Sequence, residues 1–347
     1  MKHCRRFYAL VGSFCFVLGL AACVPAAAST LVVTEPAAAP PTETPSLSPA
    51  TLPPTDTPTV EMTPVSTVRP SRAAVPTLSP TPCAPDLCII PNPFSLARPI
   101  APPGRDQIDF TYRFGSTQGG LREPHHGVEF LNSTGTPVQA AADGLVVVAG
   151  DDRKIFYGPY SYFYGNLIVL QHDLPGIAQP VYTLYGHLSQ ILVEAGEQVK
   201  VGQLIGLVGM TGVATGSHLH FEVRLGENSY SQSRNPELWL APHVDENGQL
   251  NGALAGRIVD KNGLRLDIPN IVIEHLPAPD QLADLQIYTG TYQEQDLLDQ
   301  PPWNESFAAG DLPAGWYRIE FVQYGMQERI VQVLPGQLTL VTFNLGQ

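Results

Sequence analysis

The amino-acid sequence predicts an all-β protein preceded by an extended segment. After residue 105, short runs rich in Val, Ile, Leu and Tyr alternate with Gly, Pro and Asn turns, as in antiparallel sheets. Helical periodicity is absent over any useful length between residues 106 and 224. With 347 residues, the chain exceeds what one hydrophobic core usually holds, so we expect two folded domains.

Residues 1–22 predict a secretory signal. Basic residues precede an apolar run at 7–22 that is too short to span a membrane and ends in small residues. The tetrad Leu20-Ala21-Ala22-Cys23 resembles a bacterial lipoprotein box. This resemblance implies cleavage before Cys23, acylation of its sulfur and an extracytoplasmic protein that is lipid-anchored to a bacterial membrane. An ordinary cleaved signal with a chance cysteine is the alternative.

Residues 23–104 predict a disordered linker rich in Pro, Thr, Ser and Ala. Of the chain's 34 prolines, 20 lie between residues 25 and 103, and such a composition cannot bury enough apolar surface to offset the entropy of ordering. Cys83 and Cys88 are an isolated pair beyond the membrane, and in an oxidising compartment we expect a disulfide between them. Metal binding is the weaker alternative, because no histidine or second thiol pair is near in sequence.

Residues 105–242, the middle domain, predict an antiparallel, barrel-sandwich-like β core. The predicted strands are 144–149, 166–170, 181–185, 203–208 and 218–224. The hairpin at 193–206 also looks like those of lipoyl and biotinyl carrier domains, which present a modifiable lysine at the tip. Lys200 lies between two valines, so we interpret it as a strand-surface residue instead.

Four histidines and one carboxylate of the middle domain suit a zinc site. His218 and His220 are two residues apart in a predicted strand, so their side chains share one face. His125, Glu129 and His187 come from two upstream segments. A hydrolytic zinc needs three protein ligands and an open position for water, which leaves two histidines for acid/base work.

The motifs around these residues carry a family resemblance. In chain order they are His125-x-Gly127-x-Glu129, 135–144, Tyr185-Gly-His187-Leu-Ser, 199–209 and 211–222. They resemble the lysostaphin-like (LytM-type) zinc metalloendopeptidases. The resemblance implies that His125, Glu129 and His220 hold one zinc ion. It also implies that His187 and His218 are the catalytic acid/base groups and that peptidoglycan stem or cross-bridge peptides are the substrate.

Glu129 departs from the family pattern, in which this ligand is usually aspartate. One extra methylene lengthens the side chain by about 1.5 Å and would crowd the metal if the backbone were unchanged. Glutamate is a competent zinc ligand, so we expect metal binding to survive. The alternative is a non-catalytic cell-wall-binding or amidase-activating lipoprotein with a degenerate zinc site.

Other residues of the middle domain leave two interpretations open. Glu222 shares a strand face with His220. Its carboxylate either orients that ligand or is an ordinary polar group on the surface of the strand. The aromatic-rich stretch 151–165 is either a wall of a peptide groove or a hairpin with cross-strand packing. His126 is expected at the surface, because it should face away from His125 if the segment is extended.

Residues 250–347, the C-terminal domain, predict a small β-sandwich. The stretches 254–263, 310–321 and 338–345 show alternating strands and turns and resemble prealbumin-like (carboxypeptidase-regulatory-like) domains. The domain carries no catalytic motif, so we expect a spacer or a module that binds a cell-wall or protein ligand. The net charge of -13 argues against nucleic acid as a partner of any part.

Overall fold

The computed structural model of the chain describes residues 86–292 and 297–346. The predicted signal at 1–22, Cys23 and Cys83 lie outside these residues. Cys88 is disulfide-bonded, and its pairing with Cys83 stays a prediction. Within the described part, no helix is both long and apolar enough to cross a membrane.

The all-β prediction is confirmed, and each of the five stretches predicted as strands contains one. The largest sheet of the middle domain comprises β2 (Val128–Leu131), β4 (Gly144–Asp151), β5 (Asn166–His172), β6 (Val181–Gly186), β8 (Gln198–Val199), β10 (His218–Leu225), β11 (Ser233–Arg234) and β15 (Leu297–Leu298). A smaller sheet comprises β3 (Pro137–Gln139), β7 (Gln190–Ile191) and β9 (Leu204–Leu207). Two short 3-10 helices, η1 (Tyr230–Gln232) and η2 (Pro236–Leu238), follow β10.

Strand β10 lies inside the large sheet and pairs antiparallel with β2, β6 and β11. Leu219, Phe221 and Val223 on β10 are fully buried and pack into the hydrophobic core. Because successive strand residues point to opposite faces, the even-numbered residues from 218 to 224 lie on the other face. This alternation selects the side chains that reach the candidate site.

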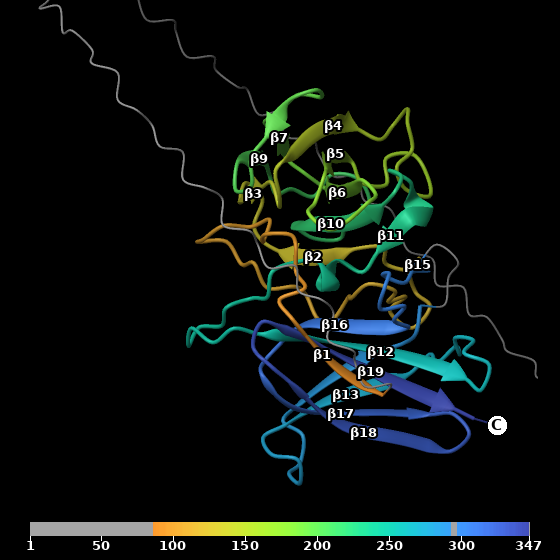
Figure 1. The fold of residues 1–347 in the computed structure, drawn as a ribbon. Coiled ribbons are helices and arrows are strands. Elements are labelled where there is room, and N and C mark those ends of the chain that lie inside the picture. The colour runs from red at the N-terminus through yellow and green to blue at the C-terminus, as the bar shows by residue number, and fades with distance from the viewer. Residues whose placement is uncertain (1–85, 293–296, 347) are drawn as a thin grey trace, which may run out of the picture. The chain divides into compact units, whose positions relative to one another are not determined.

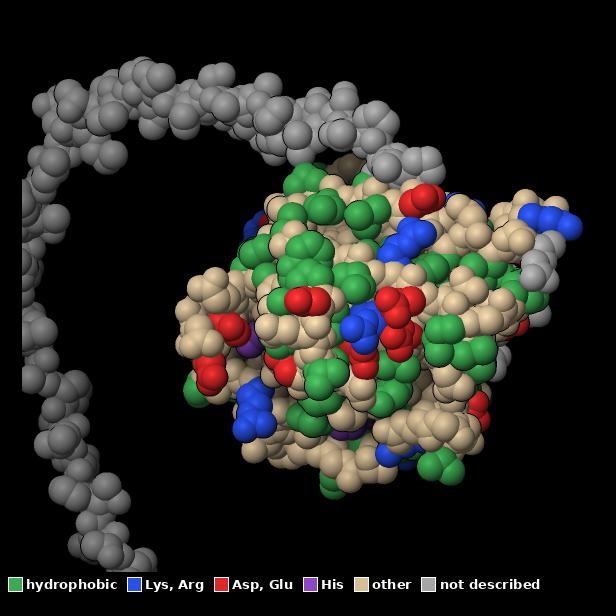
Figure 2. All heavy atoms as spheres, turned by 90° about the horizontal axis from the view of Figure 1, so that it is seen from below, with side chains coloured by type: hydrophobic (Ala, Val, Ile, Leu, Met, Phe, Trp, Pro, Cys, Tyr) green, Lys and Arg blue, Asp and Glu red, His purple; other side chains and the backbone are tan. Residues whose placement is uncertain are grey.

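The C-terminal domain is built from two four-stranded sheets that lie one above the other in Figure 1. The first comprises β1 (Leu87–Pro91), β12 (Gly252–Asp260), β16 (Phe307–Leu312) and β19 (Gln337–Leu345), and the second comprises β13 (Ile271–Leu276), β14 (Leu285–Thr289), β17 (Gly315–Val322) and β18 (Met326–Val333). Buried aliphatic and aromatic side chains from both sheets share one core. Figure 2 shows acidic and basic side chains scattered among apolar ones on the face below these strands.

The range predicted as linker extends too far, because part of it is folded. Residues 87–91 form β1, which pairs antiparallel with β19 at the edge of a C-terminal sheet. Farther along, Leu96 and Ile100 are buried in the core of the middle domain. The short apolar run Leu-Cys-Ile-Ile is typical of an edge strand, and the prolines around it masked this signal.

Two strands, β1 and β15, join sheets of the domain that their position in the sequence does not suggest. Strand β1 precedes the middle domain in sequence but joins a C-terminal sheet, whereas β15 follows the start of the C-terminal domain but pairs with β11 in the large sheet. A single core also contains Trp239 and Leu240 together with Ala255 and Leu338. The C-terminal domain is therefore packed against the middle domain rather than tethered to it.

Candidate metal centre

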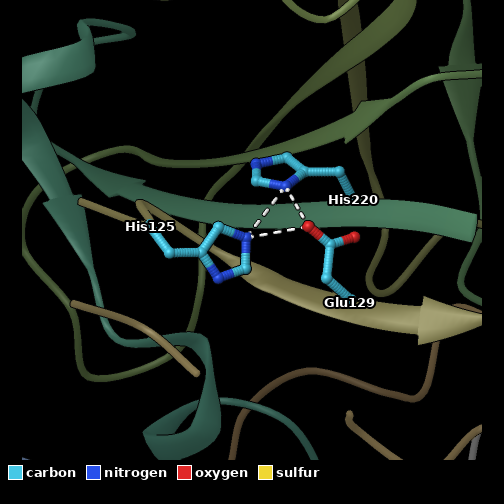
Figure 3. A group of neighbouring side chains, drawn as sticks. All are labelled: His125, Glu129 and His220. Carbon is cyan, nitrogen blue, oxygen red and sulfur yellow. Dashed lines mark hydrogen bonds and ion pairs between the residues drawn. The ribbon is translucent and has the colours of Figure 1, made fainter. Parts of the chain in front are cut away.

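Three side chains from adjacent segments meet on the face of β10 that carries its even-numbered residues. His220 lies directly opposite Glu129 of β2 in the strand register, and His125 lies just before β2. In Figure 3 the two imidazole rings and the carboxylate point toward one another. All three are buried, being 4 to 6% exposed. The structure thus brings together the three residues that the sequence predicts as metal ligands.

The donor atoms have the spacing of a tetrahedral metal site. Nε2 of His125 lies 2.9 Å from Oε1 of Glu129 and 3.2 Å from Nδ1 of His220, and Oε1 lies 3.1 Å from that Nδ1. Zinc bonds of about 2.0–2.1 Å in a tetrahedron place neighbouring ligand atoms about 3.3 Å apart. The longer side chain of Glu129 is thus accommodated, and the donor set fits zinc.

Glu129 is ionised in this arrangement. Burial alone would raise the pKa of its carboxyl group, but His220, His125 and His218 hold that pKa well below its usual range. A carboxylate that carries its charge at neutral pH needs no proton release before it binds a cation. The carboxylate of Glu129 is therefore available to a metal ion near neutral pH.

A buried carboxylate orients His220. Nε2 of His220 lies 3.0 Å from Oε1 of Glu222, which is fully buried. Glu222 also accepts hydrogen bonds from Nε of Arg224, at 2.8 Å, and from the hydroxyl of Tyr164. Burial would raise the pKa of Glu222, but Arg224 and His220 keep that pKa well below its usual range. Glu222 therefore holds the proton of His220 on Nε2 and leaves Nδ1 for a metal, so the strand-surface explanation of Glu222 is wrong.

We expect Glu222→Gln to lower zinc affinity by about 10- to 100-fold, because residues that hydrogen-bond to a metal ligand usually contribute that much to the affinity. The amide cannot replace the charge that faces both His220 and Arg224. Competition with a chromophoric chelator would measure the affinity. Glu328→Gln, an exposed change on β18, is the matched control and should leave it unchanged. Equal zinc affinity in both variants would refute the orienting role.

His187 and His218 lie beside the ligand triangle with their ring centroids 4.8 Å apart. Nδ1 of His187 donates to the Thr211 carbonyl at 2.8 Å, and Nδ1 of His218 donates to the Gly216 carbonyl at 2.9 Å. Nε2 of His218 lies 2.8 Å from Oε2 of Glu129. Burial lowers the pKa of His187 to about 3, so this ring is neutral near pH 7. The two predicted acid/base groups are thus placed at the metal centre, each with Nδ1 held by a backbone carbonyl.

Gly127, in the middle of the His-x-Gly-x-Glu motif, lies against β10. A Cβ added there would come within 2.4 Å of the Phe221 carbonyl oxygen and 2.9 Å of Nε2 of His220. We expect Gly127→Ala to separate β2 from β10 and to reduce zinc affinity about tenfold or more, since a packed interior cannot absorb a methyl group at such distances. A zinc titration would measure this. Gly150→Ala is the control, because nothing lies within 4 Å of the added Cβ, and equal losses in both variants would contradict the explanation.

Two aromatic contacts at the site are not apparent from the sequence. The ring of Tyr112 stacks on His125 with centroids 4.0 Å apart. His126 stacks on Tyr230 at 3.6 Å, and its Nδ1 lies 2.8 Å from Oγ of Ser233. The surface prediction for His126 is wrong, because residues 123–126 are not a regular strand and strand alternation does not apply to them. Burial lowers the pKa of His126 to about 4.

A groove of about 460 Å³ opens at the ligand triangle. Leu121, Tyr160, Phe163 and Val213 are among the residues that line it. Tyr160 and Phe163 come from the aromatic-rich stretch, whereas Tyr164 of the same stretch is fully buried. The groove-wall interpretation therefore holds for Tyr160 and Phe163, whereas the hairpin with cross-strand packing is wrong, because residues 152–165 form no strand. The groove joins the metal centre to an apolar wall of the kind that binds side chains of a peptide.

Lys200 is not the strand residue that the sequence suggests. It lies in the turn between β8 and β9, with its ammonium group 2.8 Å from Oδ2 of Asp143. Strands β8 and β9 pair with different sheets, so this turn is not the tip of a two-stranded hairpin like that of a carrier domain.

Comparison with known proteins identifies the middle domain. The family model described as "Peptidase family M23" matches residues 123–234, which include all the predicted catalytic and metal-ligating residues. The peptidoglycan DD-endopeptidases ShyA and ShyB of Vibrio cholerae are 43% identical over 100 residues and 41% identical over 125 residues. These matches cover 29% and 36% of this chain but only 20% and 26% of the two relatives.

Among solved structures, the catalytic domain of the antimicrobial peptidase lysostaphin from Staphylococcus simulans is 37% identical. The alignment covers 33% of this chain and 76% of that domain, with a TM-score of 0.28.

Proposed function

Because residues 123–234 form a peptidase family M23 domain, we propose that this protein is a zinc metalloendopeptidase that hydrolyses peptide bonds in peptidoglycan stem or cross-bridge peptides. The observation that carries the proposal is the buried triangle of His125, Glu129 and His220, whose donor atoms have tetrahedral spacing. The names of the relatives, peptidoglycan DD-endopeptidases, support the substrate class.

The residues of the site divide the chemistry among them. His125, Glu129 and His220 would hold the zinc ion, which when bound polarises the scissile carbonyl and lowers the pKa of a water molecule to about 7. Glu222 fixes the orientation of His220 through Nε2. His187 and His218, with Nδ1 tied to backbone carbonyls, present Nε2 to accept a proton and return it to the leaving amine. The aromatic wall of the groove holds the peptide beside these groups.

Two measurements on the purified full chain test the proposal. Metal analysis should find about one zinc per chain, as expected for one three-ligand site. Digestion of intact peptidoglycan should release soluble fragments, and mass spectrometry of the fragments would identify the bond that is cut. His218→Ala should retain zinc and lose hydrolysis, since a general acid/base group contributes about 100- to 10,000-fold. Bound zinc without hydrolysis of any cross-link type would favour the non-catalytic alternative.

We further propose that the protein is exported and anchored in a bacterial membrane through lipidated Cys23. The tetrad Leu20-Ala21-Ala22-Cys23 supports this location, as does the extended composition that separates it from the folded part. When the full gene is expressed in bacteria, the protein should sediment with membranes, and Cys23→Ala should release it to the soluble extracytoplasmic fraction. Sedimentation that is independent of Cys23 would rule out this anchor.

A further inference from the structure

We propose that the C-terminal domain forms a wall of the substrate groove and binds an uncharged N-acetylated sugar of the glycan strand that carries the cleaved peptide. The inference deepens the proposed function and rests on it for the identity of the substrate. It assigns a ligand to a domain that carries no catalytic motif.

The wall belongs to a second pocket that adjoins the groove at the metal centre. This pocket, of about 370 Å³, lies between residues 110–124 of the middle domain and residues 269–270 and 288–291 of the C-terminal domain. Gln118 and Pro124 line both the second pocket and the groove. A substrate that fills the groove therefore reaches the C-terminal domain across a single loop.

The two walls of the second pocket are fixed relative to each other. Phe114 packs edge-on against Tyr292 with ring centroids 5.2 Å apart, and both bury Leu297 in a small apolar cluster. Strand β15, which contains Leu297, pairs with β11 of the large sheet. Side-chain and strand contacts therefore hold the C-terminal wall at a fixed position relative to the metal centre. A wall that needs no ordering loses little entropy when a ligand binds.

The chemistry of the second pocket is uncharged and polar with one aromatic surface. Among the described residues that line it, only Arg113 is charged, and Glu237 neutralises its guanidinium group. Tyr288 is 69% exposed, and its hydroxyl donates to Oε1 of Gln286 at 2.9 Å, which steadies the ring. The other lining groups include the hydroxyls of Ser116, Thr117 and Thr289 and the amide of Asn270.

These features favour a sugar over the peptide as the occupant. A pyranose ring offers an apolar C–H face to an aromatic ring, and its hydroxyls and acetamide bond to neutral donors and acceptors. Stem peptides carry carboxylates and amines, which would need charged partners when they are desolvated.

Binding of peptide-free glycan to the zinc-loaded full chain tests the inference. The probe is the uncharged tetrasaccharide of N-acetylglucosamine, and calorimetric titration measures its Kd. We expect Tyr288→Ala to weaken binding about fivefold or more and Tyr288→Phe to stay within about twofold of the unmodified protein, because the ring supplies the contact. Tyr324→Ala, an exposed tyrosine outside the second pocket, is the control and should bind normally.

The outcome separates this inference from the peptidase proposal, because no bond is cleaved in the titration. Binding that depends on Tyr288 supports the sugar site even if the protein hydrolyses no substrate. An unmodified protein that does not bind the tetrasaccharide at millimolar concentration overturns the inference, and so does unchanged affinity in Tyr288→Ala. In either case hydrolysis of sugar-free cross-linked peptides can still succeed.

Discussion

Glu129→Gln is expected to remove both the metal and the activity of this protein. Oε1 of Glu129 lies within 3.1 Å of the donor nitrogens of His125 and His220, so the carboxylate supplies the negative charge of the ligand triangle. An amide of the same size has no charge to offset a divalent cation. Residues that only hydrogen-bond to a metal ligand usually contribute about 10- to 100-fold to metal affinity or activity. For a ligand itself we therefore expect losses of more than about 100-fold in zinc affinity and in kcat/KM. Zinc content after dialysis and release of peptidoglycan fragments would measure both.

Glu129→Asp is the matched control, because it restores the residue that the LytM-type pattern usually has. The charge is kept and the reach shortens by about 1.5 Å, so β2 must move toward β10 to close the triangle. We expect zinc binding to persist, weakened by about tenfold at most. A Glu129→Asp variant that binds zinc and hydrolyses peptidoglycan far better than the unmodified chain would show that the site is degenerate.

Arg113→Ala is expected to lower the free energy of unfolding by about 3–5 kcal/mol, the usual consequence of leaving one partner of a buried ion pair alone. Arg113 of the middle domain pairs with Glu237 of η2, and both are at most 3% exposed. Glu237 also accepts a hydrogen bond from the backbone of Gly310 in β16, so this pair ties the C-terminal sheet to the middle domain. Denaturant unfolding followed by circular dichroism would measure the loss.

The loss caused by Arg113→Ala should grow with pH. Burial raises the pKa of Glu237, and Arg113 lowers it, so removing the arginine raises the folded-state pKa further above the unfolded value. Between the unfolded and folded pKa values the folded state holds the extra proton, and stability therefore falls as pH rises through that window. Lys200→Ala breaks an exposed pair whose side chains are 80% and 57% exposed, and should leave the free energy of unfolding nearly unchanged at any pH. Equal losses in the two variants would contradict the buried role of Arg113.

Strand periodicity accounts for what could be predicted at the site. The alternation in β10 placed His218, His220 and Glu222 on one face, and the structure keeps them there. It could not show that Glu222 is buried, because burial depends on Tyr164, a distant residue that covers the carboxylate. His126 was assigned to the surface by the same alternation, which holds only where the backbone is a strand.

The all-β class, the group of four histidines with Glu129 and the order of the motifs could all be predicted from the chain's amino acids. These are local properties, since strand propensity, turn residues and the two-residue period are carried by short segments. Three features became apparent from the fold alone: Glu222 orients His220, β1 and β15 join sheets of the other domain, and the C-terminal domain adjoins the groove. Each of these depends on contacts between residues far apart in the chain, and no local pattern specifies which strand edge or buried charge will find its partner there.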